Sequence, residues 1–407
     1  MRIAILTNEY PPHVYGGAGV HVEYLTRELT RLDNGEHTIT VFTFGEQSLR
    51  QGNLTVQGVR PDFALPYQDP RHQKFMDTLA RDLLMMGSLR DIDVIHCHTW
   101  YTHLAGCVAR QLTGAPLVLT THSLEPHRPW KVEQLGTAYQ ASSWIERIAY
   151  QNADGVIAVS EAMREDAHTL YGVPRQRIRV IHNGIDLDQY KPTPDAAVLA
   201  RHGIDANKPY ILFVGRITRQ KGIIHLVHAI PRIHPGTQIV LCAGAPDTAE
   251  IGQEMTEAVE EARRSTANPI IWIARMLPKE DIIPLYSRAA LFVCPSVYEP
   301  FGIINLEAMA CGTPVVASAV GGIKEVVLPE ETGLLVPFES CGENDFEPRD
   351  PRRFADDLAA AINRLLADPQ RCRQMGQRAR QRVERSFGWA SIARQTCDFY
   401  KLVSDAS

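Results

Sequence analysis

The sequence predicts an α/β protein built from two doubly wound, Rossmann-like domains, and three observations support this. The 407-residue chain is longer than a single hydrophobic core usually supports. Short, continuous apolar runs alternate with helical patterns along almost the whole chain, as parallel strands covered by helices require. A polar, Pro-containing stretch at 186–209 separates two similar halves and is expected to hold a linker and a short helix.

Each half carries six expected strands. In the first half they lie at 3–7, 38–44, 93–99, 116–122, 155–160 and 178–184. In the second half they lie at 210–217, 237–244, 270–276, 291–296, 313–318 and 332–337. A helix is expected over 19–32, where the leucines at 25, 29 and 32 share one face. Ligands of such sheets bind at the carboxyl ends of the strands, so two domains suggest a central cleft between them.

Charge and cysteine usage narrow the class of protein. A formal net charge of -5 argues against a general nucleic-acid or membrane-surface binder. The eight cysteines include no C-x-x-C pair and lie mostly in apolar runs, which favours buried, reduced thiols. No signal sequence or apolar run of membrane-spanning length is evident, so a cytoplasmic protein is expected. The Arg-rich tail after Asp350 also carries acids, which favours a solvated structural face over an anion-binding patch.

Two strand-to-helix connections are candidate anion sites. The first contains Gly16 and Gly17, where backbone amides at a helix start can approach a phosphate; a tight turn without a ligand is the alternative. The second is "VGRITRQKG", which places Arg216 and Lys221 at the start of a helix. Cations oppose the helix dipole at that end, so an anionic ligand is the better explanation for them.

A third candidate ligand site is the stretch "PSVYEPFGIINLEAMACGTPVVAS". Glu299 follows a buried strand, and Glu307 lies in the next helix. Carboxylates accept hydrogen bonds from hydroxyls and turn amides donate them, which suits a polyhydroxylated ligand. His122 also ends a strand, at the edge where this fold places its chemistry.

Metal binding is weighed at three places and not favoured. The two D-x-D strings, at 91–93 and 186–188, stand before a buried strand and at the start of the linker. His96 and His98 alternate along one strand, and no third ligand is near them in the sequence. Neither a metal nor a cofactor is therefore expected.

At these residues the chain resembles the retaining glycosyltransferases of GT-B fold, in family 4, which includes bacterial glycogen synthases. The resemblance covers essentially the whole length and rests on Gly16-Gly17, "THS", "NGID", Arg216 with Lys221, and the two glutamates of E-x7-E. "EYPPHVYGGAGVHV" and "THSLEPHRPWKVEQLG" are similar to the actinobacterial branch, described as glycogen synthases or maltose-1-phosphate synthases. In this fold the final helix returns to the first domain, which implies domains at 1–187 plus 388–407 and at 188–387.

The resemblance implies a role for each matching residue. Arg216 and Lys221 would hold the donor diphosphate, with help from the Gly17 amide. Glu307 would bind the ribose hydroxyls. The donor glucose would be bound by His122, by Glu299 and by the backbone of Phe301, Gly302 and Ile303. Glu299 as a covalent nucleophile is the less favoured alternative.

The acceptor is inferred from two departures. Where many glycogen synthases carry Lys-Thr-Gly-Gly and Asp-Trp, this chain has Val-Tyr-Gly-Gly and Thr99-Trp100. It also has Arg128 and Lys131 on either side of an aromatic residue, a pattern that suits a small phosphorylated sugar. We therefore expect transfer from nucleotide-glucose, with ADP-glucose favoured, to glucose 1-phosphate and/or an α-glucan.

Several alternatives stay open. The chain is either this glucosyltransferase, a relative with a lipid or inositol acceptor, or a non-catalytic sugar-nucleotide-binding regulator. The sequence does not separate ADP from UDP as the donor nucleotide, or a monomer from a homodimer.

Overall fold

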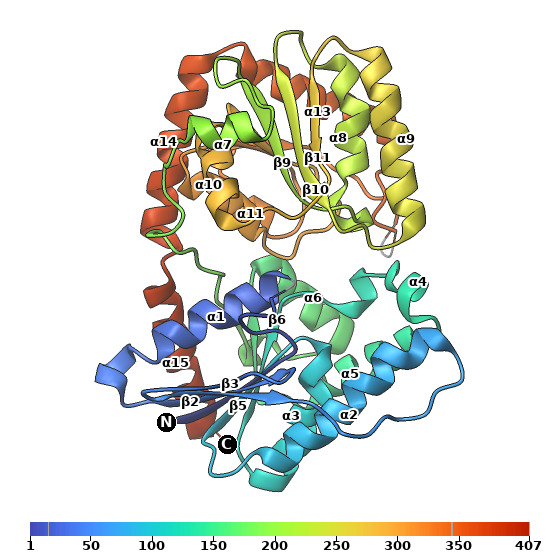
Figure 1. Cartoon of the computed structure of the whole chain (residues 1–407). Helices are drawn as coiled ribbons and strands as arrows, with labels where there is room; N and C mark the ends of the chain where they lie inside the picture. The colour runs from blue at the N-terminus through green and yellow to red at the C-terminus, as the bar shows by residue number, and fades with distance from the viewer. Residues whose placement is uncertain (15, 343–344, 407) are drawn as a thin grey trace. The chain divides into compact units, whose positions relative to one another are not determined.

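The computed structural model describes residues 1–14, 16–342 and 345–406, and the chain divides into two compact units. One unit comprises Met1–Gly184 with Trp389–Ser407, and the other comprises Ile185–Gly388. Both are α/β units with a largely parallel central sheet (Figure 1). The fold class predicted from the apolar runs is therefore confirmed.

The first unit contains an eight-stranded sheet in the order β3-β4-β2-β1-β5-β6-β7-β8. All neighbouring strands are parallel except β3 and β4, which form an antiparallel pair. The strands are β1 (Arg2–Thr7), β2 (Thr38–Phe44), β3 (Ser48–Gln51), β4 (Leu54–Val59), β5 (Val94–His98), β6 (Leu117–Thr121), β7 (Gly155–Ala158) and β8 (Ile178–Val180). The helices are α1 (Gly17–Leu29), α2 (Gln73–Ser88), α3 (His103–Thr113), α4 (Lys131–Leu135), α5 (Ala138–Asn152), α6 (Glu161–Tyr171) and α15 (Trp389–Ala406).

The second unit contains a six-stranded, all-parallel sheet in the order β11-β10-β9-β12-β13-β14. Its strands are β9 (Tyr210–Arg216), β10 (Gln238–Gly244), β11 (Ile270–Ile273), β12 (Leu291–Cys294), β13 (Val315–Ser318) and β14 (Gly333–Val336). The helices are α7 (Ala196–Arg201), α8 (Ile223–Ala229), α9 (Ala249–Ser265), α10 (Lys279–Arg288), α11 (Ile303–Ala310), α12 (Ile323–Val326), α13 (Pro351–Leu366) and α14 (Pro369–Ser386). Short 3-10 turns lie at Leu32–Gly35, Pro70–His72, Trp100–Thr102, Glu125–His127, Arg175–Arg177, Arg219–Lys221 and Ile230–Arg232.

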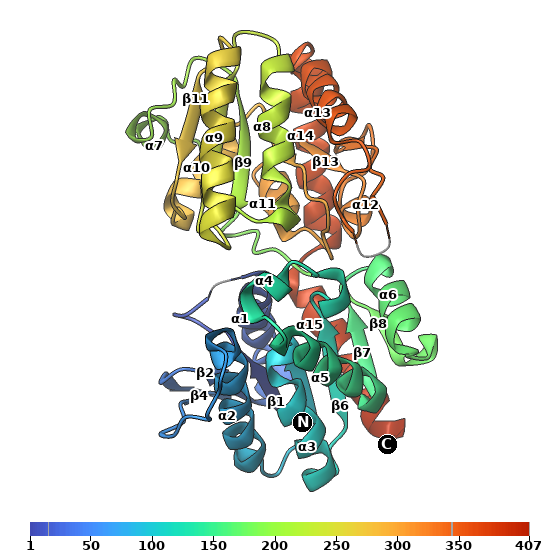
Figure 2. The same cartoon turned by 90° about the vertical axis from the view of Figure 1, so that its right-hand side faces the viewer.

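Helices cover both faces of each sheet, which explains the continuous apolar strands (Figures 1 and 2). In the first unit α1 and α15 lie together on one face, and α2, α3 and α5 lie on the other. In the second unit α8, α9 and α13 share one face, while α11 and α14 pack on the opposite face. The strand residues between these layers are almost completely buried.

The last helix, α15, completes the core of the first unit. Phe399 and Val403 pack against Gly155 so closely that a Cβ on this glycine would lie 2.7 Å from Val403. Trp389 stacks on Tyr24 of α1 with ring centroids 5.7 Å apart. The small residue in β7 and the aromatic residue in α1 therefore provide the surface on which α15 docks.

Two sequence expectations differ from the structure in the first unit. The hairpin of β3 and β4 was not predicted, because β3 is wholly exposed and its sequence "SLRQ" has no apolar pattern. The strand expected over 178–184 ends at Val180, since the chain then leaves the sheet toward Asn183 and Gly184.

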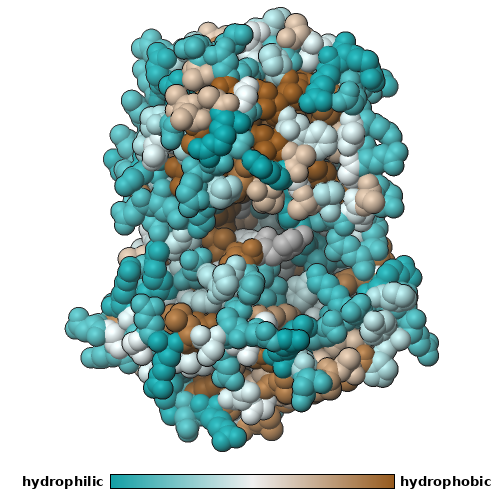
Figure 3. All heavy atoms as spheres, viewed as in Figure 1, coloured by the Kyte–Doolittle hydropathy of each residue, from teal (hydrophilic) through white to brown (hydrophobic). Residues whose placement is uncertain are grey.

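The surface is mostly hydrophilic on the face shown in Figure 3, with apolar side chains scattered between polar ones. Among the described residues, no helix combines the length and the apolar character needed to cross a membrane.

Candidate active site

The connection between β9 and α8 places two cations beside the end of the second sheet. Arg216 is the last residue of β9, and Lys221 closes a 3-10 turn whose N-cap, Thr218, accepts a hydrogen bond from the Lys221 amide at 3.2 Å. Gly222 follows with a φ of 58°, and a Cβ there would lie 2.2 Å from the carbonyl oxygen of Pro295. Only glycine allows this close approach to the segment after β12.

That approach brings Lys221 to Glu299. The Lys221 Nζ lies 2.7 Å from the Glu299 Oε2, and the Ser296 hydroxyl donates to the same oxygen at 3.2 Å. The Glu299 side chain is 9% exposed, so this ion pair is largely shielded from water. The structure thus joins two residues that lie 78 positions apart in the sequence.

Arg216 has an acidic partner that the sequence analysis did not identify. Its Nη1 donates to the Asp247 Oδ1 at 2.7 Å. Asp247 lies just after β10, the strand next to β9, and its side chain is 11% exposed. An acid following a neighbouring strand was the available signal, but the expected strands alone did not say which strands are neighbours.

The turn before α11 supplies backbone groups beside Glu299. Gly302 is the N-cap of α11 with a φ of 100°, and Ile303 is the first helical residue. The Phe301 side chain is buried and lies against Phe387, with ring centroids 6.0 Å apart. Phe301 is therefore anchored in the interior, so any ligand contact from this turn comes from the backbone.

Glu307 lies in α11 and is held by two tyrosines. The hydroxyls of Tyr190 and Tyr286 donate to its Oε1 and Oε2, each at 3.0 Å. Burial raises the pKa of Glu307, and the two hydroxyl donors oppose that rise. Neither tyrosine was identified from the sequence, since each lies on a different element and neither belongs to a motif.

In the first unit, the glycine-rich loop after β1 folds around Glu9. The Gly16 amide donates to the Glu9 carboxylate at 2.7 Å, and a Cβ on Gly19 would lie 2.8 Å from the same carboxylate. Gly17 begins α1 and is exposed. The Gly16 amide therefore has an internal acceptor, whereas Gly17 lies at the exposed helix start. Tyr15 of the same motif lies outside the described residues.

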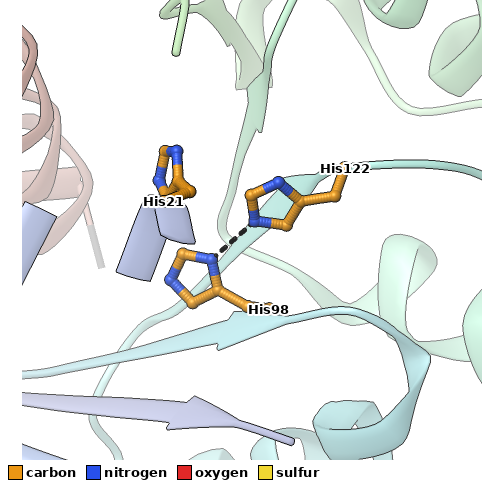
Figure 4. A group of neighbouring side chains, drawn as sticks. All are labelled: His21, His98 and His122. Atoms are coloured by element: carbon orange, nitrogen blue, oxygen red, sulfur yellow. Dashed lines mark hydrogen bonds between the residues drawn. The ribbon is translucent and has the colours of Figure 1, made fainter. Parts of the chain in front are cut away.

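His122 belongs to a cluster of histidines at the carboxyl ends of β5 and β6 (Figure 4). The His122 Nε2 lies 2.9 Å from the His98 Nδ1, and the His21 ring of α1 is 4.8 Å from the His122 ring. Burial, together with neighbouring histidines, holds the pKa of His122 well below its usual value. The ring is therefore neutral at pH 7 and suited to hydrogen bonding with a hydroxyl.

His96 has a separate role, in the core of the same unit. Its Nδ1 lies 2.6 Å from the Tyr400 hydroxyl of α15, and its Nε2 lies 2.6 Å from the Thr120 hydroxyl. Both ring nitrogens are thus used, which links β5 to α15 and to β6.

Of the four expected acceptor residues, two lie next to His98. Thr99 has a φ of 68°, unusual for a β-branched residue, and its hydroxyl donates to the Asn8 side chain at 2.9 Å. Trp100 is buried and stacks on Tyr101 and Phe75, with centroids 4.3 and 5.9 Å away. Its ring faces are covered by protein, so a sugar cannot stack on Trp100 in this structure.

The other two lie in the loop after β6, and one of them is internal. The Lys131 Nζ lies 2.7 Å from the Glu125 Oε1, and both side chains are buried. Although burial pushes it upward, the Lys131 charge, with that of Arg128, holds the pKa of Glu125 below its usual value. Lys131 therefore neutralises a buried carboxylate in this structure, and the phosphate contact expected for it stays a prediction.

Arg128 is only partly buried and keeps free hydrogen-bonding capacity. Its Nη1 donates to the Ser123 hydroxyl at 3.4 Å, and its buried Nε has no hydrogen-bond partner among the described residues. Ser123 directly follows His122, so Arg128 lies near the histidine cluster.

Seen together, the candidate residues form one constellation in each unit. The second unit joins Arg216, Lys221, Glu299 and Glu307 around the ends of β9 and β12. The first unit joins His122 to the loop that carries Arg128. Paired cations beside a helix start and carboxylates that accept from hydroxyls can bind a sugar joined to a diphosphate.

Comparisons with known proteins agree with this class of site. Residues 15–189 match the model of "Glycosyltransferase Family 4", and residues 196–344 match that of "Glycosyl transferases group 1". The chain is 48% identical to alpha-maltose-1-phosphate synthase of Mycolicibacterium smegmatis over 99% of this chain and 100% of that protein. It is 31% identical to glycogen synthase of Mycobacterium tuberculosis, over 98% of this chain and 94% of that one.

The architecture has a counterpart among solved structures. Sucrose-phosphate synthase from Thermosynechococcus elongatus superposes with a TM-score of 0.79 at 29% identity, over 100% of both chains. Two Rossmann-like units in one chain are the architecture of the GT-B glycosyltransferases. The chain belongs to glycosyltransferase family 4.

Proposed function

We propose that the enzyme moves glucose, with retention of configuration, from ADP-glucose to glucose 1-phosphate, forming maltose 1-phosphate. The observation that carries the proposal is the cationic centre of Lys221 and Arg216, each within 2.7 Å of a carboxylate, at the end of the second sheet. A nucleotide diphosphate sugar matches this charge pattern, and the similarity to alpha-maltose-1-phosphate synthase supports glucose as the transferred group.

The donor would exchange the internal ion pairs for its own contacts. Its diphosphate takes Arg216 and Lys221, while Glu299 and the amides of Gly302 and Ile303 turn to the glucose hydroxyls. Glu307 accepts from the ribose hydroxyls. Each charge-assisted contact contributes about 1.5–3 kcal/mol in place of the pair it displaces, so the net gain is a fraction of their sum.

The cations would then accelerate the reaction. When the bond between glucose and phosphate breaks, negative charge grows on the leaving diphosphate. Lys221 and Arg216 stabilise that charge more strongly in the transition state than in the bound donor. The leaving phosphate oxygen takes the proton of the attacking acceptor hydroxyl, and neutral His122 orients the glucose by accepting from or donating to its 6-hydroxyl.

For the acceptor, Arg128 is the residue that we assign to the phosphate of glucose 1-phosphate. Its Nη1 makes a long contact of 3.4 Å to the Ser123 hydroxyl, which a phosphate would replace with a charge-assisted hydrogen bond. Thr99 lies on the same edge of the first sheet. Lys131 acts through the loop instead, because its pair with Glu125 holds the segment that carries Arg128.

The proposal is tested by incubating the protein with ADP-glucose and glucose 1-phosphate and following the sugars by NMR. An α-linked maltose 1-phosphate is the expected product. No disaccharide phosphate, with donor still consumed when glycogen is added, would make the α-glucan the acceptor instead. Consumption only with an inositol or lipid acceptor, or donor binding without turnover, would support the alternatives of another acceptor or of a regulator.

A pair of variants tests the two assignments. Arg128→Ala is expected to raise the KM for glucose 1-phosphate about tenfold and to leave that for ADP-glucose unchanged, with exposed Arg90→Ala as the control. Glu307→Ala is expected to raise mainly the donor KM, whereas Lys221→Ala also lowers kcat, because its contact strengthens as charge develops. Equal effects of both substitutions on both parameters would contradict this division of roles.

A further inference from the structure

Three histidines from three separate elements converge in the first unit. His21 comes from α1, His98 ends β5 and His122 follows β6 (Figure 4). Each offers a ring nitrogen, and these three nitrogens all lie within 4.8 Å of one another. Of these three, the sequence pattern indicates only His98 as a candidate metal ligand, because the other two are distant from it in the chain.

Each of the three rings can offer a ligand atom, because a neutral imidazole keeps one nitrogen lone pair. Neutral imidazole is a preferred ligand of Zn²⁺ and of neighbouring transition-metal dications.

A second residue orients the first ring. The His21 Nδ1 lies 2.6 Å from the Asn183 side-chain oxygen, an acceptor that holds the ring proton on Nδ1. The lone pair of neutral His21 then resides on Nε2. A hydrogen bond of this kind behind a histidine ligand is typical of metal sites, where it fixes the tautomer of the ring.

The His98–His122 pair needs only a proton shift within one ring. One N–H proton lies between the facing nitrogens, His98 Nδ1 and His122 Nε2. A metal that takes both lone pairs moves this proton to the far nitrogen of the same ring. In the part of the chain that the structure describes, the far nitrogen of His98, Nε2, is buried without a hydrogen-bond partner, so no contact is broken there. This shift keeps the proton on the same ring.

We propose that His21, His98 and His122 bind one transition-metal dication of the Zn²⁺ class, leaving a fourth position open. Tetrahedral Zn²⁺ with bonds of about 2.0–2.1 Å needs its ligand nitrogens roughly 3.3 Å apart, so the widest separation here closes by at most about 1.5 Å. The bound metal occupies the His122 nitrogen and blocks glucose binding. This inhibitory consequence rests on the proposed function, whereas metal binding does not.

A second group, Asp33 with His37 and Cys397, offers a useful contrast. Asp33 already pairs with Arg394 at 2.7 Å and lies 3.7 Å from the Lys401 ammonium. These cations repel a metal ion, while burial raises the pKa of the Cys397 thiol. A metal bound there would carry a thiolate ligand, which distinguishes it from the site of three histidines.

Calorimetric titration of the whole protein with Zn²⁺ and absorption titration with Co²⁺ test the proposal without any substrate. One equivalent should bind at micromolar affinity, and the Co²⁺ spectrum should lack a thiolate charge-transfer band. His98→Gln and His21→Gln should each weaken binding at least 100-fold, while the exposed His234→Gln should change nothing. Absence of binding, a thiolate band, or unchanged affinity in both variants would overturn the site.

A measurement on the unaltered protein guards against variants that fail to fold. With ¹⁵N-labelled histidine, Zn²⁺ should shift the ring nitrogens of His21, His98 and His122, and the Tm should rise with metal concentration. Shifts confined to exposed histidines would contradict the proposal.

The inhibitory consequence is measured separately. Zn²⁺ should raise the donor KM at least tenfold, and a chelator should reverse the effect. Metal bound at the three histidines with unaltered kinetics would overturn the inhibition alone. An inactive protein that still binds metal would instead count against the proposed function.

Discussion

At the scale of single residues, Glu307 depends on partners that belong to no sequence motif. Glu307 is a buried carboxylate, and it keeps two hydroxyl donors, Tyr190 and Tyr286, each at 3.0 Å. A buried carboxylate without donors would be costly to ionise. The two tyrosines thus favour the charged form, which is the form that the proposed ribose contact requires.

Tyr190→Phe is expected to raise the donor KM about three- to tenfold. Burial already raises the pKa of Glu307, and loss of a hydroxyl donor raises it further. When the pH is lowered, the variant should therefore lose donor binding at a higher pH than the unaltered protein does. The KM for ADP-glucose measured across pH 5–9 checks this, with unaltered kcat at high pH as the sign of a positioning role. A pH profile that does not move would show that Tyr190 does not tune the carboxylate.

At the scale of elements, close packing between turns decides where the charged residues lie. The backbone at Gly222 touches Pro295, and the backbone at Gly321, with a φ of 45°, lies so near Glu299 that a Cβ would be 2.0 Å from its carbonyl oxygen. The first contact holds the β9–α8 turn against the segment that carries Glu299, and the second holds the connection between β13 and α12 against it. The pair of Lys221 and Glu299 is a consequence of this backbone packing.

Gly222→Ala should therefore lower both the stability of the second unit and the activity. Its Cβ meets the Pro295 carbonyl at 2.2 Å with a φ of 58°. Gly203→Ala is a matched control, because its φ is 72° but a Cβ there meets no atom within 4 Å. In thermal unfolding, Gly222→Ala should lower the Tm by several degrees. The control should lose about 1 kcal/mol or less of its free energy of unfolding. Equal losses would mean that φ strain alone, and not packing, constrains this turn.

The loop of Arg128 is held by a buried acid pair that makes stability depend on pH. The Glu146 carboxylate accepts from the Glu125 amide at 2.7 Å and from the Tyr171 hydroxyl. Burial, with the charge of Glu125, raises the pKa of Glu146 to about 8. Between about pH 4.5 and 8, the folded state therefore keeps a proton that the unfolded state has already lost. Stability from this group is present below that range and is lost as the pH rises through it.

Glu146→Gln should remove this loss, since the amide oxygen keeps both hydrogen bonds without a charge. The variant is expected to match the unaltered protein near pH 4, below the range of the loss, and to exceed its Tm by several degrees near pH 9. Each 1 kcal/mol moves the Tm by roughly 2–4 °C in a domain of this size. Calorimetric scans at the two pH values check this, and a difference that is the same at both would disprove the linkage.

At the scale of the whole molecule, the first unit is completed by the last segment of the chain. Residues of α15 belong to the same buried cluster as those of β1, β2 and α1. The Tyr400 hydroxyl also lies 2.6 Å from His96 in β5. Removing this helix would expose Val22, Leu25 and other apolar residues that α15 covers.

Truncation after Gly388 is thus expected to unfold the first unit while the second unit keeps its own sheet and core. Limited proteolysis should leave a resistant fragment within Ile185–Gly388. Arg394→Gln, which breaks only the partly exposed pair with Asp33, serves as the control and should be resistant throughout. A truncated chain whose first unit stays resistant would contradict this dependence.

The sequence by itself determined the α/β class and most of the strands, and it singled out Arg216, Lys221, Glu299 and Glu307 as candidate donor residues. Continuous apolar runs and cations at a helix start are local signals, and both reflect physics within a few residues of chain. It failed at the β3–β4 hairpin, where an exposed strand leaves no apolar pattern.

Only the tertiary structure decided which residues meet. The pairing of Arg216 with Asp247, the two tyrosines on Glu307 and the convergence of three histidines all depend on strand order, which periodicity does not encode. The pair of Lys131 with the buried Glu125 shows the same limit, because nothing in the local sequence indicates that these two residues face each other. Local patterns specify the elements, whereas close packing between distant segments specifies their partners.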